Sequence, residues 1–258
     1  MDYNYHTHTT RCNHATGTER EYIEHAIRAG IRHLGFSEHI PLLFPDGHES
    51  FFRLPLRDTE EYVSTIRHLA DEYRDRIAIH VGFEMEYYPA YFDTMLETAK
   101  RAGAEYLLLG QHFIENESPL YPSSSTPCDS EWELCRYVDA LLAGIGTGVF
   151  TYVAHPDVFS FTGDPAVYKR EMSRLCEGAA RSGTPFEINF LGIRARRRYP
   201  YEPFWQIAGE YGVPVTFGMD AHAAPDAGDT ASKRRAMELV EAYHLNYIGA
   251  PRLVAIAE

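Results

Sequence analysis

The chain has 258 residues, of which 45% are hydrophobic, and its formal net charge is −13 at pH 7. This length suits one α/β barrel of typically about 250 residues, so we expect residues 1–258 to form a single domain. Such an acidic chain lacks the broad positive face that a phosphate backbone requires, which argues against binding of long nucleic acids. No apolar run approaches the about 20 residues of a membrane span, and the start of the chain lacks the pattern of a signal peptide.

The number and spacing of the cysteines indicate the redox compartment in which the protein works. They are Cys12, Cys128, Cys135 and Cys176, far apart and without a Cys-x-x-Cys pair. We therefore expect free thiols in a reducing cytoplasm. We expect neither a membrane nor a nucleic-acid partner, and a monomer or a small homo-oligomer.

Segments of strand character and of helix character alternate along the chain. A strand at 3–7 is followed by a helix at 18–30, which opens with a capping box of Thr18 and Glu21. The order then continues as strand 33–37, loop 41–57, helix 58–73, strand 77–83, helix 91–102, strand 106–110, loop 115–129, helix 131–143, strand 149–154, helix 165–181, strand 185–190, helix 203–211, strand 213–218 and helix 229–243. The alternation predicts parallel strands linked by helices, and seven strands rather than eight indicate an irregular barrel. Loop 41–57 is too long for a plain connection and is a candidate lid.

Residues able to bind a metal follow most of these strands. They are His6, His8, His14, His39, Glu84, His112, His155, Asp220 and His222. In a barrel of parallel strands, the carboxyl ends of the strands meet at one mouth, where catalytic residues lie. His6 and His8 are two residues apart and can point to the same ion, as can Asp220 and His222. Imidazole and carboxylate are ligands of Zn, Mn and Fe, and Glu84 is the candidate to bridge two ions. The pattern therefore predicts a cluster of divalent metals at this mouth.

One basic segment, residues 194–198, opposes the acidic trend of the chain. A guanidinium can hold two oxygens of an anionic group at once. Arg194 follows Gly192 just past the sixth strand, so it is the favoured contact, with Arg197 and Arg198 next. We expect Arg196 to be solvated.

The ligand motifs together resemble the signature of the PHP (polymerase and histidinol phosphatase) superfamily over almost the whole chain. The motifs are His6-x-His8, His14, Ser37-Glu38-His39, Glu84, Gly110-Gln111-His112, Ala154-His155-Pro156 and Asp220-Ala221-His222. Glu187-Ile188-Asn189, Gly192-Ile193-Arg194 and Tyr199-Pro200, together with the long loops, resemble the monofunctional histidinol-phosphatase branch.

The resemblance implies a distorted (β/α)7 TIM-like barrel that holds three divalent ions. The first ion would be held by His6, His8, Glu84 and Asp220. The second would be held by Glu84, His112 and His155. The third would be held by His14, His39 and His222.

The resemblance also implies an activity, the hydrolysis of the phosphate monoester L-histidinol phosphate to L-histidinol and phosphate in histidine biosynthesis. The ions would lower the pKa of the attacking water, and Arg194 would neutralise charge on the phosphoryl group. Asp220, His222 or water would protonate the leaving alkoxide. Further candidate substrate contacts are Arg197, Arg198, Asn189 and His48, with Asp157 and Glu115 as weaker candidates.

Other functions would need other residues. A phosphoesterase of the same superfamily that acts on nucleotides or another small phosphate ester is the main alternative. An amidohydrolase would commonly need a carboxylated lysine as its bridge, but Lys100, Lys169 and Lys233 all fall on expected helices. A non-enzymatic role such as metal storage is disfavoured because the ligand set is unbroken.

Overall fold

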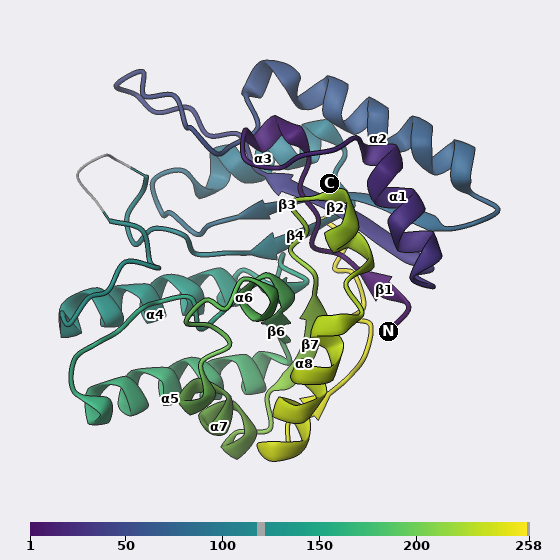
Figure 1. The fold of residues 1–258 in the computed structure, drawn as a ribbon. Helices are drawn as coiled ribbons and strands as arrows, with labels where there is room; N and C mark the ends of the chain where they lie inside the picture. The colour runs from purple at the N-terminus through teal and green to yellow at the C-terminus, as the bar shows by residue number, and fades with distance from the viewer. Residues whose placement is uncertain (118–121, 257–258) are drawn as a thin grey trace.

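The computed structural model describes residues 1–117 and 122–256. Eight strands in this part of the chain form one sheet in the order β1 to β8 (Figure 1). The strands are β1 Tyr3–Asn4, β2 His33–His39, β3 Ala78–Met85, β4 Tyr106–Leu109, β5 Tyr152–Val153, β6 Phe186–Asn189, β7 Pro214–Gly218 and β8 Asn246–Tyr247. Each strand pairs in parallel with the next one along the chain. Parallel neighbours joined by crossover helices are the topology of an α/β barrel, so the expected fold class is confirmed.

Helices connect the strands and lie on the outside of the sheet (Figure 1). They are α1 Glu19–Arg28, α2 Thr59–Tyr73, α3 Phe92–Ala102, α4 Glu131–Gly146, α5 Pro165–Ser182, α6 Phe190–Arg194, α7 Glu202–Glu210 and α8 Ala231–Ala242. Three 3-10 turns are η1 Thr10–Cys12, η2 Leu56–Asp58 and η3 Ala224–Gly228. The predicted capping box at Thr18 and Glu21 is present, and it satisfies amide groups that the first turn of a helix leaves unpaired.

In the described ranges, the sheet from β1 to β8 is not closed into a regular barrel, but one isolated bridge links the segments just beyond β1 and β7. Thr7 forms a parallel bridge with Ala221, His8 N donates to Ala221 O at 3.0 Å, and Ala221 N donates to His6 O at 3.2 Å. This pairing sets the segment 6–8 beside the segment 220–222. The eighth strand, β8, pairs with the outer side of β7 and has only two residues, too few for a recognisable alternation, so the predicted count of seven strands was one short.

Tyrosines fill the interior of the barrel. A separate small core joins Tyr3, Tyr5, Tyr106, Leu108, Tyr152 and Ala154. Two of their hydroxyls are paired, since Tyr106 donates to Tyr5 O at 2.8 Å and Tyr3 lies 2.9 Å from Thr216 Oγ1, whereas the buried hydroxyl of Tyr152 has no hydrogen-bond partner among the described residues. Leu107 and Leu109 alternate with the inward residues of β4 and belong to the larger core between sheet and helices. The tyrosine layer leaves the carboxyl end of the barrel for polar groups.

The two predicted long loops lie at this carboxyl end. Loop 41–57 places Phe51 and Phe52 on the wall of a cavity, and residues 123 and 125 of the second loop lie on the same wall. Residues 118–121 of loop 115–129 lie outside the described residues. Within the described ranges, none of the helices combines the length and the apolar character needed to cross a bilayer.

Candidate metal centre

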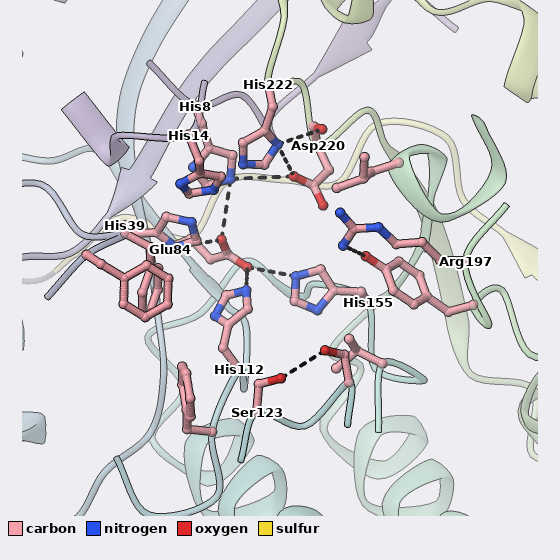
Figure 2. Close-up of a pocket in the computed structure, with 17 residues that line it drawn as sticks. His8, His14, His39, Glu84, His112, Ser123, His155, Arg197, Asp220 and His222 are labelled. Carbon is pink, nitrogen blue, oxygen red and sulfur yellow. Dashed lines mark hydrogen bonds and ion pairs between the residues drawn. The ribbon is translucent and has the colours of Figure 1, made fainter. Parts of the chain in front are cut away.

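The predicted ligands come together at the carboxyl mouth of the barrel, around Glu84 (Figure 2). Eight of them line a cavity of about 450 Å³: His8, His14, His39, Glu84, His112, His155, Asp220 and His222. The ninth, His6, is fully buried, and its Nε2 lies 3.5 Å from Glu84 Oε2.

The two oxygens of Glu84 face two different sets of imidazoles. Oε2 lies 3.5 Å from His8 Nε2 and 3.2 Å from His39 Nδ1. Oε1 lies 2.9 Å from His155 Nε2 and 3.4 Å from His112 Nε2. A carboxylate placed in this way can bind one ion through each oxygen, which is the geometry that a bridging ligand needs.

Asp220 closes the opposite side of the centre. Its Oδ1 lies 3.7 Å from His6 Nε2, 3.6 Å from His8 Nε2 and 3.2 Å from His222 Nδ1. Asp220 has φ +46° and His155 has φ +31°, a left-handed conformation that costs a non-glycine residue about 1–3 kcal/mol and gathers at functional sites.

In the described residues, possible ligand atoms form five groups whose members lie within 4.8 Å of one another, and one of these, His6, His155 and Asp220, mixes the first and second implied sets. Three other groups resemble the three implied ion sites. They are His6, His8 and Glu84; His39, Glu84 and His112; and His14, His39 and His222. The last group is the implied third set. The first two share Glu84, as the implied first and second sets do.

Unpaired buried atoms identify what this cluster can hold. In the described part of the chain, the buried atoms without a hydrogen-bond partner include His6 Nε2, His8 Nε2, His39 Nδ1, Glu84 Oε2 and Asp220 Oδ1. Each such atom costs about 1–3 kcal/mol when it is left unsatisfied. Divalent cations would satisfy all of them, and a set of nitrogen and carboxylate donors fits Zn, Mn or Fe.

Charge within the cluster acts differently on different ligands: Glu187 and Asp220 raise the pKa of His6 against the effect of burial, and Glu84 and Glu86 likewise raise the pKa of His112. Burial alone would raise the pKa of Glu84, but the charges of His112 and His6 outweigh burial and hold it well below its usual value. Burial lowers the pKa of His8 to about 4. Ionised carboxylates and neutral imidazoles are the forms that bind metal.

A second layer of carboxylates orients the histidine rings. His6 Nδ1 donates to Glu187 at 2.8 Å, His8 Nδ1 donates to Glu38 at 3.3 Å, and His112 Nδ1 donates to Glu86 at 3.0 Å. In each pair, the bond to Nδ1 leaves Nε2 directed at the centre, an arrangement that supports metal-binding histidines.

Sequence reasoning missed the role of these three glutamates. Glu38 and Glu187 were noted only as parts of motifs, and Glu86 was not considered. The available signal was an acidic residue within or at the end of a strand that should be buried, because such a group needs a partner.

Two glycines make room for the buried carboxylates. A Cβ on Gly110 would overlap the carboxylate of Glu84, and a Cβ on Gly218 would overlap the carboxylate of Glu187. Glycine is therefore needed directly after β4 and at the end of β7 so that these acids can reach the histidines.

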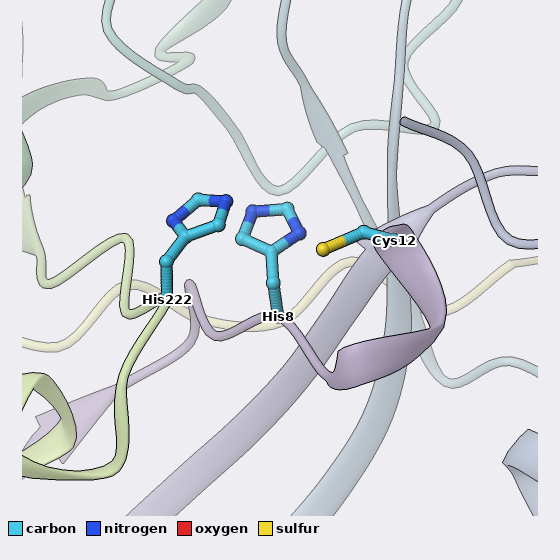
Figure 3. A group of neighbouring side chains, drawn as sticks. All are labelled: His8, Cys12 and His222. Carbon is cyan, nitrogen blue, oxygen red and sulfur yellow. The ribbon is translucent and has the colours of Figure 1, made fainter. Parts of the chain in front are cut away.

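Cys12 lies unexpectedly close to the centre. Its Sγ comes within 4.8 Å of ligand atoms of His8 and His222 (Figure 3). The thiol donates to Thr9 O at 3.1 Å, and burial raises its pKa, so it is a protonated thiol next to the ligands. All four cysteines are free, as expected.

The arginine contacts differ from those expected. Arg194 donates to the carbonyls of Met219 and Asp220, both at 2.5 Å, and lies 3.3 Å and 3.6 Å from Asp226 and Asp229. Among the described residues, it is not part of the cavity wall. The expectation that Arg194 holds the phosphate is therefore corrected, because α6 turns its side chain onto the segment that carries Asp220.

Arg197 takes the place expected for Arg194. It lines the cavity, and its guanidinium donates to the Tyr199 hydroxyl at 3.1 Å. Arg198 instead donates to Ser160 Oγ at 2.8 Å and lies 4.7 Å above the Tyr201 ring, so it is also corrected as a phosphate contact. Arg196 is exposed.

The structure also places Asn189 and His48 away from the cavity. Asn189 is buried, donates to Asp220 Oδ2 at 3.0 Å and to Glu187 at 2.9 Å, and thus orients a ligand rather than a substrate. His48 borders a separate cavity and lies 3.7 Å from the carboxylate of Glu117. Both expected substrate contacts are corrected, because each side chain faces other protein groups.

The two weaker candidates also face protein groups. Asp157 accepts from Tyr201 N at 2.6 Å and from Trp205 Nε1 at 2.9 Å, and burial raises its pKa to about 6. Glu115 accepts from Arg136 at 3.1 Å on the surface.

The rest of the cavity wall is mostly apolar. It consists of Phe51, Phe52, Phe113, Ser123, Ser125, Val158, Leu191 and Tyr199. A small molecule with an anionic end and an aromatic or apolar end fits such a wall.

The parallel α/β fold and the buried histidines and carboxylates at its carboxyl mouth together define the class of this protein, which is that of metal-binding α/β barrels. Residues 4–190 match the family model described as the PHP domain. This match covers more than half of the chain, and the chain belongs to the PHP domain family.

Relatives of known name are similar over most of their length. A protein of Deinococcus radiodurans named "Probable histidinol-phosphatase" is 27% identical over 232 residues, which covers 86% of this chain and 87% of that protein. The "Histidinol-phosphatase" of Bacillus subtilis is 27% identical over 261 residues, which covers 86% of this chain and 94% of that protein. A solved structure from Lactococcus lactis, a histidinol phosphate phosphatase in complex with zinc, L-histidinol and phosphate, has a TM-score of 0.73 at 20% identity and covers 99% of this chain and 97% of its own. This last likeness concerns the fold.

Proposed function

We propose that the protein is a metal-dependent phosphate monoester hydrolase that converts L-histidinol phosphate and water to L-histidinol and phosphate. The observation that carries the proposal is the convergence of nine candidate ligand residues, with Glu84 among them, at one mouth of the barrel, in and beside a cavity that Arg197 also lines. Two relatives that carry histidinol-phosphatase names over 86% of the chain support the choice of substrate. We place the enzyme in the cytoplasm, in histidine biosynthesis, as one domain of residues 1–258 that is a monomer or a small homo-oligomer.

The ligand groups support a centre of three divalent ions, Zn, Mn or Fe. When bound, such ions activate water as a nucleophile and neutralise charge on phosphoryl oxygens. His6, His8, Glu84 and Asp220 would hold the first, Glu84, His112 and His155 the second, and His14, His39 and His222 the third. Zinc is present in the Lactococcus lactis structure that shares this fold.

Arg197 is the candidate that binds the phosphoryl group from the protein side. Its guanidinium lines the cavity at the Tyr199 hydroxyl, 3.1 Å away, and can offer two parallel donors to phosphoryl oxygens. Charge that develops on those oxygens during transfer would be stabilised by this cation.

The leaving group would lie against the aromatic side of the cavity. Phe51, Phe52 and Phe113 offer ring faces for an imidazole. The leaving alkoxide needs a proton, and His222 or water would supply it. Asp220 fits a ligand better than a proton donor, because His6, His8 and Asn189 already surround its oxygens.

Steady-state kinetics on the metal-loaded protein tests the substrate. We expect kcat/KM for histidinol phosphate to exceed that for nucleoside monophosphates and for a chromogenic phosphodiester, and activity to disappear with a chelator and return with Zn or Mn. A higher kcat/KM for nucleoside monophosphates would instead support a phosphoesterase of the same family that acts on nucleotides or another small ester. A loaded protein that hydrolyses none of these compounds would contradict the proposal.

A further inference from the structure

Behind His112, a group of buried charges joins the candidate metal centre to both long loops. Arg53 of loop 41–57 is buried, with its side chain 1% exposed. Its NH1 lies 2.8 Å from Glu86 Oε2, and its Nε donates to Glu117 Oε2 at 2.7 Å. Glu86 Oε1 in turn accepts from His112 Nδ1 at 3.0 Å. A continuous set of charged contacts therefore runs from Glu117 through Arg53 and Glu86 to a metal ligand.

The chemistry of this group depends on the shape of a guanidinium. Arg53 meets two buried carboxylates through different nitrogens, and it also donates from NH1 to Ile40 O at 3.3 Å. The planar fork of an arginine can hold such partners in one arrangement, whereas a lysine has a single ammonium. Loss of one partner from a buried ion pair is strongly destabilising, because the remaining charge stays buried and unpaired.

Arg53 also touches the cavity wall through its neighbour in the chain. Its guanidinium lies 4.8 Å from the centre of the Phe52 ring. Phe52 lines the cavity, and its ring lies 4.9 Å from that of His39 and 5.9 Å from that of His112. The position of the Arg53 side chain can therefore affect both the conformation of loop 41–57 and, through Phe52, the rings of the candidate ligands His39 and His112.

We propose that Arg53 is a positioning residue for the metal centre. Through Glu86 it fixes the orientation of His112, and through Glu117 and Phe52 it holds the two long loops against the cavity. The inference rests on the metal centre of the proposed function and goes beyond it, since Arg53 contacts no candidate ligand directly and does not itself line the cavity. His48, 3.7 Å from Glu117 Oε1, belongs to the outer end of this group.

Retention of metal, measured without substrate, tests the proposal. Arg53→Lys and Arg53→Met would be loaded with zinc and dialysed against increasing chelator, with the bound metal counted by elemental analysis. We expect Arg53→Met to lose one ion at a chelator concentration about 10–100-fold lower than the wild type, in the range found for supporting residues of metal sites. Arg53→Lys should lie between the two. Arg57→Met is the matched control, because Arg57 belongs to the same loop and its side chain is 75% exposed.

A double variant tests whether Arg53 acts through Glu86. If it does, Arg53→Met in a Glu86→Gln background should add little to the loss of metal caused by Glu86→Gln alone. Additive losses, or retention by Arg53→Met and Arg53→Lys equal to that of the wild type, would overturn the inference. If Arg53→Met does not fold, Arg53→Lys, which keeps the charge, decides the matter. If the metal-loaded wild type failed to hydrolyse histidinol phosphate, that result would count against the proposed function alone, because metal retention is measured without substrate.

Discussion

At the scale of single residues, Glu84 is the candidate ligand whose carboxylate contacts imidazoles on both of its oxygens. It is buried at the end of β3, with His6, His8 and His39 at one oxygen and His112 and His155 at the other. Gly110 leaves the space that its carboxylate occupies. Removal of this carboxylate would leave five imidazoles without their common counter-charge.

Glu84→Ala is therefore expected to be more damaging than loss of a ligand that serves one ion. His14→Ala is the comparison, because His14 belongs only to the third group. Glu84→Ala should lower kcat by more than the about 10–100-fold typical of supporting residues, and should reduce the content of two ions. Kinetics and elemental analysis measure both effects. Near-normal turnover with full metal content would show that Glu84 does not bridge.

Arg197 and Arg194 provide a second residue-scale prediction. Arg197→Lys should lower kcat/KM for histidinol phosphate by about 10-fold or more, because a lysine cannot present two parallel donors, a difference worth at least about 1.4 kcal/mol. Arg194→Lys should mainly lower thermal stability, because Arg194 holds the carbonyls of Met219 and Asp220. Arg196→Lys is the control on an exposed arginine of the same segment. Equal and small kinetic effects at 194 and 197 would contradict the assignment of Arg197.

At the scale of elements, short segments decide where side chains point. Asn189 ends β6 and caps α6, where its Oδ1 accepts from Gly192 N at 3.2 Å. The five-residue helix that follows turns Arg194 toward 219–220 and leaves Arg197 at the cavity. A sequence window of this length carries too little periodicity to predict such a helix.

Helices α4 and α5 are joined by charges around Glu171. Glu171 is nearly buried, accepts from Arg170 at 2.7 Å, and pairs with Arg174. Arg174 also donates to Asp139 of α4 at 2.7 Å. Burial opposes ionisation of Glu171, but Arg170 and Arg174 outweigh it, and the pKa of Glu171 lies below its ordinary value of 4.5.

The sign of this shift predicts a pH dependence. A carboxyl with a depressed pKa in the folded state contributes stability above its ordinary pKa and loses it as the pH falls through the folded pKa. Because both arginines are about half exposed, Glu171→Gln should lower the free energy of unfolding by only about 1 kcal/mol at neutral pH.

Urea denaturation of metal-free protein measures this loss without interference from metal release in acid. The difference between Glu171→Gln and the wild type should shrink as the pH falls below the ordinary glutamate pKa of 4.5 and through the lower pKa of the folded state. Glu177→Gln, which changes an exposed carboxyl on the same helix, should have little effect at neutral pH or in acid. A loss of the same size in acid would contradict the ionic origin of the effect.

At the scale of the whole molecule, the candidate metal centre ties the first and last parts of the barrel together. The bridge between Thr7 and Ala221 brings the segments just beyond β1 and β7 side by side, and the ligands come from segments spread from residue 6 to residue 222. Ions bound there would stabilise the folded state, because an unfolded chain does not hold the set together.

Metal removal should therefore lower the melting temperature as well as abolish activity. Saturation of a site at 100 times its Kd contributes about 2.7 kcal/mol, and each kcal/mol corresponds to about 2–4 °C for a chain of this size. Scanning calorimetry before and after chelation measures the shift. Elemental analysis should find close to three ions per chain after loading with Zn or Mn. One ion or none would contradict the trinuclear proposal.

The sequence by itself determined the fold class and the identity of the candidate ligands. Both depend on local patterns: strand and helix alternation predicts parallel pairing, and pairs such as His6 and His8 point the same way because residues two apart share a face. All nine predicted ligands do meet at one mouth, since the carboxyl ends of parallel strands share an edge.

Only the tertiary structure decided which groups surround those ligands. Glu38, Glu86 and Glu187 became partners of histidines through contacts between strands, and Arg53 reached Glu86 from a loop more than thirty residues away along the chain. Arg194 and Arg197 are three residues apart and chemically identical, yet α6 directs one to the protein and the other to the cavity. The physical reason is that the direction of a side chain depends on backbone turns and on partners that are distant along the chain. Neither can be predicted from the residues that are next to it in the sequence.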